Sequence, residues 1–545
     1  MHSLQGVNIL FEKGILSESI KKIILYFNTV LRIIRSDYNR EVDKTRNFDK
    51  IKKFFDMSEK NDYTLDNQTW DDLDMNKVYA KLDRTYSSPG EAALYSMLRN
   101  PLMKEEKLKE RDKLIQVFKK DSKLREKLQS IFFNLNNDYK NCFLDMIEND
   151  LMVNKAKYYF YTFLGKIIPL IIILLAIFIN VKFMIALFVL SYINIHINSR
   201  EVKAIKSNGI FYLRKNIKAA KKIVSVNNKE TIHYKDKITS MLKSIKDIDR
   251  ATKLIGFINM WGGLFEPISV LFLLEETTYY AISDKIKEEK EVLMELYYTV
   301  GELEALISIS GYQHNLGQLF VKPKFIEDIT IHIKDGIHPL IDTPVGNSIN
   351  IENQGIVLTG TNMSGKSTFL RMMGVNIIFA QSFYFVLAKE YSAPFFNIVS
   401  SISPNDDLTK GKSFFMAEVE SILRIIKALE KDVPVFCPID EIFRGTNPIE
   451  RIAMSAEILT YLNNGKTISI VATHDRELTD ILKENYDFYY FSENVDTNRG
   501  LSFDYKIKKG ISQTRNAIKL LEYMGYPKEI IDKAYKRAEI IEKLL

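Results

Sequence analysis

A long apolar run is the feature that most restricts what this chain can fold into. Between Ile167 and Ile193 the polar residues are Asn180, Lys182 and Ser191. A run of this kind must be covered either by the core of a large helical protein or by lipid. Around Asn180 it divides into two segments of roughly 16 to 20 residues, close to the length that crosses a bilayer. We therefore expect a helical hairpin, with a pair of buried core helices as the alternative to membrane-spanning ones.

Charged residues beside the run favour the membrane interpretation. Basic residues both precede and follow it, whereas the turn between the two segments contains Lys182 alone: Lys155, Lys157 and Lys166 lie before the run, and Arg200, Lys203 and Lys206 lie after it. Basic flanks tend to stay on the cytoplasmic side of a membrane. We therefore expect residues 158–198 to form a transmembrane hairpin, with both termini in the cytoplasm.

Other features agree with a cytoplasmic location for most of the chain. The N-terminal residues lack the basic start, apolar run and cleavage site of a secretory signal. Cys142 and Cys437 are far apart, so neither a disulfide framework nor a thiolate metal site is indicated. Residues 201–250 are rich in Lys and Arg. We expect a solvated helical arm there, with lipid headgroups and then DNA as alternative partners.

The strongest chemical signal is a glycine-rich loop that follows an apolar, β-rich run. Its pattern is G-x-x-x-x-G-K-S, formed by Gly360, Thr361, Asn362, Met363, Ser364, Gly365, Lys366 and Ser367, with Thr368 next. Between a strand and a helix, such a loop encloses nucleotide phosphates with its backbone N–H groups. We expect Lys366 to reach the β and γ phosphates and Ser367 to bind Mg²⁺. A plain glycine-rich turn is the alternative.

Two later strand ends carry residues suited to hydrolysis. Asp440 and Glu441 follow an apolar run that begins at Val433, and His474 follows another that ends at Ala472. Asp440 is suited to hold Mg²⁺, and Glu441 to orient or deprotonate the attacking water. If these strands lie parallel in one sheet, His474 reaches the same edge and can contact the γ phosphate.

Together these motifs resemble the MutS family of ATPases. The family pattern T-G-P-N-M-x-G-K-S-T is matched except that Thr361 replaces proline. The segments 413–419, 440–446 and 472–474 resemble its S-x-F-M-x-E-M, D-E-x-x-R-G-T and A-T-H motifs. The resemblance implies ATP and Mg²⁺ as cofactors, ATP hydrolysis, and dimers in which Ser413 contacts the nucleotide of the partner subunit.

The resemblance also implies the fold class. We expect a mainly helical core, or lever, domain with an inserted transmembrane hairpin, followed by an α/β P-loop ATPase domain of ABC/MutS type. The expected boundaries are an N-terminal helical segment 1–50, a helical core 51–157 and 199–335, the hairpin 158–198, and an ATPase domain 336–545 that ends in dimerisation helices.

The sequence departs from the family in ways that leave two functions open. The first 50 residues do not resemble its mismatch-reading domain, and the apolar run lies where its DNA clamp would be. The family core favours an ATPase that binds duplex DNA as a homodimer in a role like mismatch repair. The apolar run favours a membrane-anchored mechanical ATPase that acts on a protein or lipid partner without DNA.

Overall fold

The computed structural model describes residues 18–149, 154–207, 209–260, 262–352, 355–361, 364–402, 414–475, 477–496, 500–511 and 517–544. The chain divides into two compact units. The helical unit contains residues 1–59, 82–96 and 113–315, and the sheet unit contains residues 60–81, 97–112 and 316–545. Residues 60–81 and 97–112, which the sequence places with the helical core, therefore cluster with the sheet.

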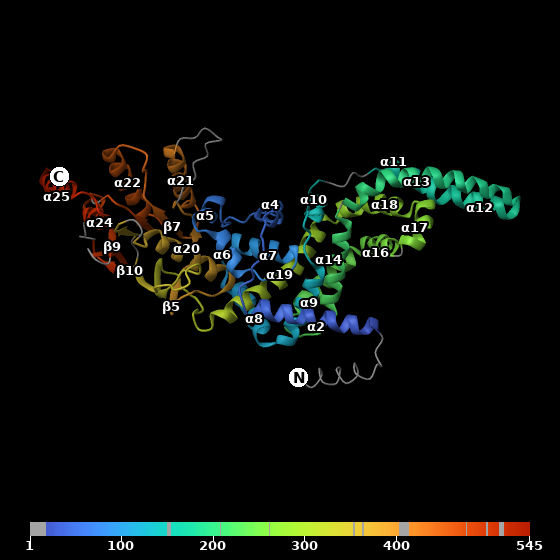
Figure 1. Cartoon of the computed structure of the whole chain (residues 1–545), viewed down its shortest axis with the longest axis horizontal. Helices are drawn as coiled ribbons and strands as arrows, with labels where there is room; N and C mark the ends of the chain where they lie inside the picture. The colour runs from blue at the N-terminus through green and yellow to red at the C-terminus, as the bar shows by residue number, and fades with distance from the viewer. Residues whose placement is uncertain are drawn as a thin grey trace. The chain divides into compact units, whose positions relative to one another are not determined.

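The helical unit is built from helices of very different length (Figure 1). Helices α7 (Ser88–Arg99) and α8 (Glu105–Lys120) each have several residues in both units. The others are α2 (Glu18–Tyr38), α3 (Phe48–Ile51), α4 (Lys53–Met57), α9 (Ser122–Leu135), α10 (Cys142–Glu148), α14 (Ile210–Val224), α15 (Ile232–Ser244), α16 (Lys246–Met260), α17 (Gly262–Leu271), α18 (Leu274–Glu288), α19 (Lys290–Leu316) and the hairpin helices described below.

Small residues along α19 let another segment of backbone lie directly against it. A Cβ atom on Gly301 would come within 2.0 Å of the Pro89 carbonyl oxygen, so only glycine permits this approach. Further along α19, the Ser308 hydroxyl donates to the carbonyl of Leu82 (2.8 Å) and accepts from the N–H of Arg84 (2.7 Å). Residues 82–90 are thus held against the longest helix of the unit.

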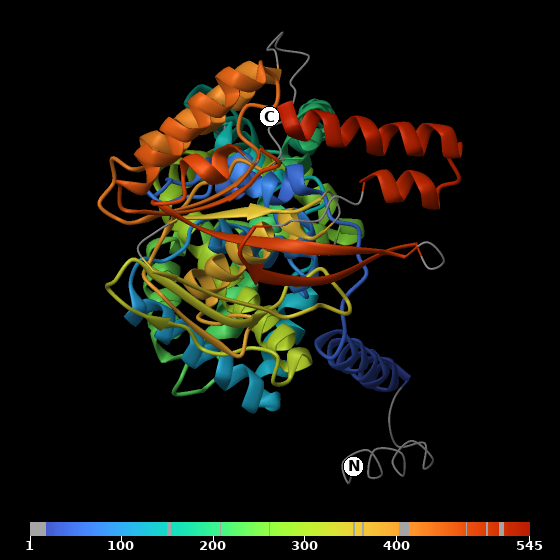
Figure 2. The same cartoon turned by 90° about the vertical axis from the view of Figure 1, so that its left-hand side faces the viewer.

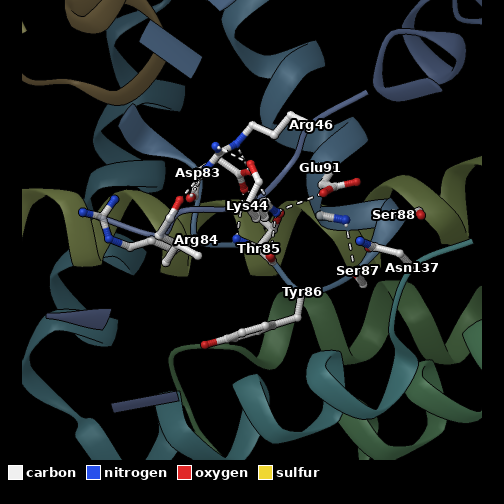
Figure 3. Close-up of polar contacts among 12 residues, drawn as sticks. Lys44, Arg46, Asp83, Arg84, Thr85, Tyr86, Ser87, Ser88, Glu91 and Asn137 are labelled. Carbon is white, nitrogen blue, oxygen red and sulfur yellow. Dashed lines mark hydrogen bonds and ion pairs between the residues drawn. The ribbon is translucent and has the colours of Figure 1, made fainter. Parts of the chain in front are cut away.

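A buried ionic cluster links residues 44–46 to residues 83–91 (Figure 3). The Lys44 ammonium is 2.8 Å from Asp83 and 2.9 Å from Glu91, and Arg46 Nε is 2.9 Å from the same Asp83 carboxylate. Burial alone would raise the pKa of Asp83, but the charges of Lys44 and Arg46 lower it below its usual value. Since each buried charge has a partner, the cluster joins residues 44–46 to the start of α7 without an isolated buried ion.

Glu304 of α19 is buried differently, beside the N-terminus of α7. Its carboxylate accepts hydrogen bonds from the Tyr86 N–H (2.5 Å) and the Ser87 hydroxyl. Burial nevertheless raises the pKa of Glu304 to about 8, because these donors do not replace the lost solvation. Glu304 therefore keeps its proton in the folded protein over a range of pH where the unfolded chain releases it.

The apolar run forms two helices joined at Asn180, as the sequence predicts. The first continues through α11 (Lys155–Thr162), the π-helical turn Phe163–Ile167 and α12 (Ile168–Phe178). The second contains a short 3-10 turn, Val181–Phe183, and α13 (Met184–Ser207). They lie side by side and extend from the rest of the helical unit (Figure 1).

The apolar side chains of this hairpin are largely exposed. The stretches Lys155–Phe178 and Val181–Glu201 are each long and apolar enough to cross a membrane, and only 17% of the most apolar part of each is buried. Phe178 is 79% exposed and Phe188 78% exposed. The protein interior therefore does not cover the hairpin, so the alternative of two buried core helices does not hold in this structure.

Two asparagines of α13 face the protein, in contrast to the exposed apolar side chains of this helix. Asn194 donates to the carbonyl of Leu271 (2.7 Å), and Asn198 donates to the Glu276 carboxylate (2.7 Å). These two asparagines are one helical turn apart, so they face the same neighbours, α17 and α18. These two polar side chains therefore lie against the protein, while most of the large apolar side chains of the hairpin remain exposed.

The sheet unit contains two sheets and the helices around them (Figure 2). Its strands are β1 (Lys324–Phe325), β2 (Thr330–Gly336), β3 (Asn347–Glu352), β4 (Gly355–Thr359), β5 (Glu390–Ala393), β6 (Asn397–Ile398), β7 (Val435–Asp440), β8 (Thr467–Ala472), β9 (Tyr486–Asp496) and β10 (Gly500–Lys509). Its helices are α5 (Asn67–Asp72), α6 (Met75–Leu82), α20 (Lys366–Phe383), α21 (Phe414–Ala428), α22 (Pro448–Asn463), α23 (Glu477–Ile481), α24 (Ala517–Tyr523) and α25 (Lys528–Leu544).

The larger sheet has the strand order β10-β9-β4-β8-β7-β6, and the smaller has β1-β5-β2-β3. Strands β4, β8, β7 and β6 are parallel, with β9 parallel to β4 and antiparallel to β10. Helix α20 contacts β7 and β8 of the larger sheet and β2 of the smaller one. A hydrophobic core involving α21, α22 and α23 also packs on the larger sheet. The expected α/β architecture is confirmed.

The raised pKa of Glu304 predicts how stability depends on pH. Between about pH 4.5 and pH 8 the native state retains a proton that the unfolded state has released, so the free energy of unfolding should fall as the pH rises. The slope from this group is at most about 1.4 kcal/mol per pH unit. Glu304→Gln should remove it, so that the stability of the variant relative to wild type increases with pH. Denaturant unfolding across this pH range measures the free energy of unfolding of wild type and of Glu304→Gln. If the two proteins show the same dependence on pH, Glu304 does not have the raised pKa.

Candidate functional site

The glycine-rich loop lies at the carboxyl end of β4, in the middle of the larger sheet. Gly360 and Gly365 have φ angles of +135° and +112°, which L side chains rarely adopt. A Cβ atom on Gly360 would also lie 2.6 Å from the Phe491 carbonyl oxygen. Glycine is therefore required at both ends of the loop, and α20 begins directly after the second glycine.

Lys366 starts α20 and turns its side chain back over the loop. It is 5% exposed, and its ammonium donates to the carbonyl oxygens of Gly360 (2.7 Å) and Thr361 (3.0 Å). A buried ammonium held by neutral carbonyls gains from a nearby anion. The loop thus presents a positive charge and a helix N-terminus at one place, which is the chemistry that binds phosphate.

Strand β7 brings Asp440 to the same place. The Ser367 hydroxyl, one residue after Lys366, donates to the Asp440 carboxylate. Asp440 is 8% exposed, and its main-chain carbonyl accepts from Arg444 (2.8 Å). A hydroxyl and a carboxylate in contact are ligands of the hard kind that Mg²⁺ prefers, so this pair fits a Mg²⁺ ion bound beside phosphates.

Glu441 follows with a backbone conformation that is unusual for a residue with a side chain. Its φ angle is +60°, and its N–H continues the sheet by donating to the carbonyl of Ala472 (2.9 Å). Its carboxylate lies 2.8 Å from Arg444 Nε and 3.3 Å from His474 Nε2. Strained backbone of this kind is common where a side chain must be aimed at a ligand.

His474 lies between Glu441 and Lys366. Its Nε2 is 3.3 Å from Glu441 Oε1 and 3.4 Å from Lys366 Nζ. Burial and the charge of Lys366 lower the pKa of His474 below its ordinary value, although Glu441 opposes them. A neutral imidazole can either donate to Glu441 or accept from Lys366, so its hydrogen bond can change as charge changes at the site.

The structure adds two residues that the sequence reasoning does not assign to the site, Glu418 and Arg444. The Glu418 carboxylate, 4% exposed, accepts from the backbone N–H groups of Arg444 (3.0 Å) and Gly445 (3.3 Å). It thereby fixes the turn that carries Glu441. Glu418 lies in the segment 413–419 and Arg444 in the segment 440–446, both of which resemble MutS motifs. This resemblance is the sequence signal that could have identified the two residues.

A cavity of about 360 Å³ adjoins the loop and is large enough for a nucleoside base. It is lined by His338, Gly365, Thr368, Phe369, Phe491 and Tyr505, among others. Burial lowers the pKa of His338 to about 4, and its Nδ1 accepts from the Leu340 N–H (3.2 Å). Its Nε2 is buried and has no hydrogen-bond partner among the described residues. A neutral imidazole in this arrangement carries a hydrogen on Nε2 that a ligand can accept.

The predicted site residues thus fall into two groups. The structure brings together Gly360, Thr361, Ser364, Gly365, Lys366, Ser367, Thr368, Asp440, Glu441 and His474 at one edge of the sheet. Asn362, Met363 and Ser413 lie outside the described residues. Ser364 is 1% exposed, and its hydroxyl has no hydrogen-bond partner in the described structure. An unsatisfied buried hydroxyl in the loop is a further observation that fits a phosphate ligand.

Comparison with known proteins agrees with this geometry. The family model of MutS domain V matches residues 356–542. The DNA mismatch repair protein MutS of Listeria monocytogenes serotype 4a is 31% identical over 281 residues, and that of Listeria welshimeri serovar 6b is 32% identical over 281 residues. The DNA mismatch repair protein MutS of Thermus thermophilus is 29% identical over 265 residues.

The C-terminal half of this chain is homologous to MutS. It carries a MutS domain V ATPase, preceded by a helical region. The aligned part is 49% of this chain and 32% of the Listeria monocytogenes MutS, and 48% and 32% for the Thermus thermophilus protein. The match therefore spans about a third of the length of these MutS proteins, and a MutS-type ATPase domain generally uses ATP with Mg²⁺.

The position of Glu441 predicts a separation of binding from turnover. Glu441→Gln keeps the size of the side chain and its contacts with Arg444 and His474, but removes the base. We expect kcat for ATP hydrolysis to fall by about a hundredfold or more, with ATP affinity changed little. Equilibrium binding of ATP and single-turnover hydrolysis measure the two effects. Turnover at the wild-type rate would remove Glu441 from this role.

Proposed function

We propose that this chain is a membrane-anchored ATPase of MutS type that works as a homodimer through its ATPase domains. The observation that carries the proposal is the combination of Lys366, Ser367 and Asp440 in one site with a hairpin whose apolar side chains are largely exposed. The cycle of ATP binding and hydrolysis then acts on a partner at the membrane.

In this proposal the ATP phosphates lie over the loop 360–367. Lys366 exchanges its bonds with the carbonyls of Gly360 and Thr361 for bonds with the β and γ phosphates. Ser367 and Asp440 would hold Mg²⁺, and the ion would supply positive charge to the phosphate oxygens. The nucleoside base occupies the cavity lined by Phe491 and Tyr505.

Hydrolysis depends on Glu441 and His474. Glu441 orients the attacking water and accepts its proton as the water oxygen bonds to the γ phosphorus and the bond to the bridging oxygen breaks. ADP and phosphate are the products. His474 is within reach of Glu441 and Lys366, so it contacts the γ phosphate and responds to its loss.

The dimer brings a second subunit to each site. Ser413 and the start of α21 contact the nucleotide bound by the partner subunit, as the resemblance to MutS implies. ATP then favours the closed dimer and hydrolysis favours the open one, so the nucleotide shifts the population between two arrangements.

The hairpin anchors the chain in the membrane, with residues 158–198 spanning it and the ATPase and both termini in the cytoplasm. The helical stretches Lys155–Phe178 and Val181–Glu201, of 24 and 21 residues, begin and end three residues outside this range. They extend about 36 Å and 32 Å at 1.5 Å per residue, compared with a hydrocarbon core about 30 Å thick. The basic flanks on one side and the turn with Lys182 on the other give the orientation.

Charges placed on the exposed face of the hairpin test the anchor. Leu170 and Phe188 are 57% and 78% exposed, so Leu170→Asp/Phe188→Asp should not disturb the fold in water. Inside a bilayer each aspartate costs about 3 kcal/mol. We expect the double variant to leave the membrane fraction and to lose binding to liposomes, with ATPase activity retained.

The matched control places aspartate at two exposed apolar positions outside the hairpin, Ile232 and Leu319, which are 56% and 60% exposed. This variant should remain in the membrane fraction. If wild-type protein is found in the soluble fraction and does not float with liposomes, the anchor is wrong.

A second candidate function is the binding of duplex DNA in a role like mismatch repair. It is favoured by a row of exposed lysines on α14, Lys215, Lys218 and Lys222, which lie three and four residues apart and so share one face. The opposite face of α14 is buried and includes Leu213, Ile217 and Ala220. A packed helix with a basic outer face can bind the phosphates of DNA or the headgroups of lipids.

The salt dependence of duplex binding tests this function. Each phosphate contact contributes about 0.9 to the slope of log K against log salt concentration. If DNA is bound here, Lys215→Ala/Lys218→Ala/Lys222→Ala should reduce the slope by about 2 to 3. The matched triple variant on α8, Lys107→Ala/Lys109→Ala/Lys120→Ala, should leave it unchanged. No binding of wild type to perfect or mismatched duplex at low salt would exclude DNA as the partner.

A further inference from the structure

Residues 399–402 form the outermost paired backbone of the larger sheet, next to β7. The N–H groups of Val399 and Ser401 face β7 and donate to the carbonyls of Phe436 (3.1 Å) and Pro438 (3.0 Å). Pro438 has no N–H to return, so this pairing lacks one bond just before Asp440. An edge that is short of a bond needs support from its other side.

That support comes from α5, a helix more than 300 residues earlier in the chain. The Asp72 carboxylate accepts from the Ser400 hydroxyl (2.7 Å) and the Ile402 N–H (3.0 Å). The Thr69 hydroxyl oxygen accepts from the Ser400 N–H (3.2 Å). The outward N–H groups of Ser400 and Ile402 are therefore satisfied by α5, and Asp72 is only 2% exposed.

The same residue also contacts the helix that follows the phosphate-binding loop. The main-chain carbonyl of Asp72 accepts from Arg371 Nε of α20 (2.7 Å). Next to it, Leu73 packs against Gly374, where a Cβ atom would come within 2.8 Å of the leucine side chain. Asp72 thus joins α20, which carries Ser367, to the edge segment beside β7, which carries Asp440.

The last step of this connection reaches the site itself. The Asp440 N–H donates to the carbonyl of Ser401 (2.9 Å), between the two residues that Asp72 holds. The Asp440 carboxylate accepts from Ser367. A displacement of residues 400–402 would therefore move the backbone of Asp440 and change the spacing of the Ser367 and Asp440 oxygens.

We propose that Asp72 is a positioning residue of the ATPase, which sets the geometry of the Ser367–Asp440 pair by holding residues 400–402 against β7. The proposal rests on the assignment of Mg²⁺ to Ser367 and Asp440, and it is independent of the membrane anchor. Residues 60–81 belong to the sheet unit, and the chain on either side of them, at residues 59 and 82, belongs to the helical unit. Asp72 therefore also lies on a covalent route by which the state of the site can reach the helical unit.

The test compares full-length proteins by the Mg²⁺ concentration for half-maximal ATP hydrolysis and by the equilibrium binding of Mg²⁺ in the presence of a non-hydrolysable ATP analogue, which needs no turnover. Partners that hold metal ligands in place typically change metal affinity by about 10 to 100-fold when removed. We expect Asp72→Ala to raise the Mg²⁺ concentration for half-maximal activity by about tenfold. Asp72→Asn keeps a hydrogen-bond acceptor for Ser400 and Ile402, so its Mg²⁺ requirement should be much closer to that of wild type. Asp71→Asn removes the same charge at the exposed neighbouring position and should behave as wild type.

Two further variants separate the possible outcomes. Asp440→Asn must itself raise the Mg²⁺ requirement; if it does not, the assignment of the metal is wrong and the proposal loses its basis. If Asp440→Asn raises it and both Asp72 variants keep the wild-type value, Asp72 is not a positioning residue. Thermal unfolding is recorded in parallel. If Asp72→Ala does not fold, Ser400→Ala decides the question, because it removes a hydrogen bond to Asp72 and should raise the Mg²⁺ requirement. A wild-type value in Ser400→Ala would then overturn the proposal.

Discussion

The site depends on the register of three parallel strands. Leu358, Ala472 and Asp440 lie in one row across β4, β8 and β7, so the residues that follow them leave the sheet at the same level. Because parallel strands end at a common edge, three segments far apart in the sequence supply the phosphate-binding loop, His474 and Glu441 within hydrogen-bond range of one another. A shift of one residue in any strand would turn the relevant side chain to the other face.

Unfavourable backbone conformations are concentrated just beyond that row. Glu441 and Phe443 have positive φ angles, and each such residue costs roughly 1 to 3 kcal/mol. Glu418 offsets this by accepting two backbone N–H groups of the same turn, and the sheet hydrogen bond of the Glu441 N–H fixes where the turn begins. The result is a carboxylate aimed by its main chain and held between Arg444 and His474, rather than one free to rotate.

Short local patterns in the sequence predict the phosphate-binding loop, the strand ends that carry the site residues, and the helical hairpin. The loop from Gly360 to Ser367, the carboxylates after β7 and the histidine after β8 are short motifs with fixed chemistry, and the parallel sheet follows from their arrangement. The helical hairpin follows from the length of the apolar run. Contacts between distant segments are not predicted by such patterns. No motif around Asp72 indicates that it binds the strand edge at Ser400. Phe491 and Tyr505 reach the cavity through the pairing of β9 and β10, which has no sequence motif either. The same limitation explains why residues 60–81 and 97–112 cluster with the sheet although their sequence resembles a helical core.

The composition of the sheet unit from three separate segments has a consequence for how the chain is made. The residues that cap the sheet edge, Thr69 and Asp72, leave the ribosome about 330 residues before the strand segment they cap, and the hairpin is synthesised between them. During translation residues 69–72 are therefore made long before the strand segment that they bind. The larger sheet of the ATPase cannot form completely until β10 has been synthesised. Such non-local pairing slows folding and leaves an unprotected strand edge in any fragment that begins after residue 112. Excising the ATPase at its apparent sequence boundary would thus remove part of its own architecture.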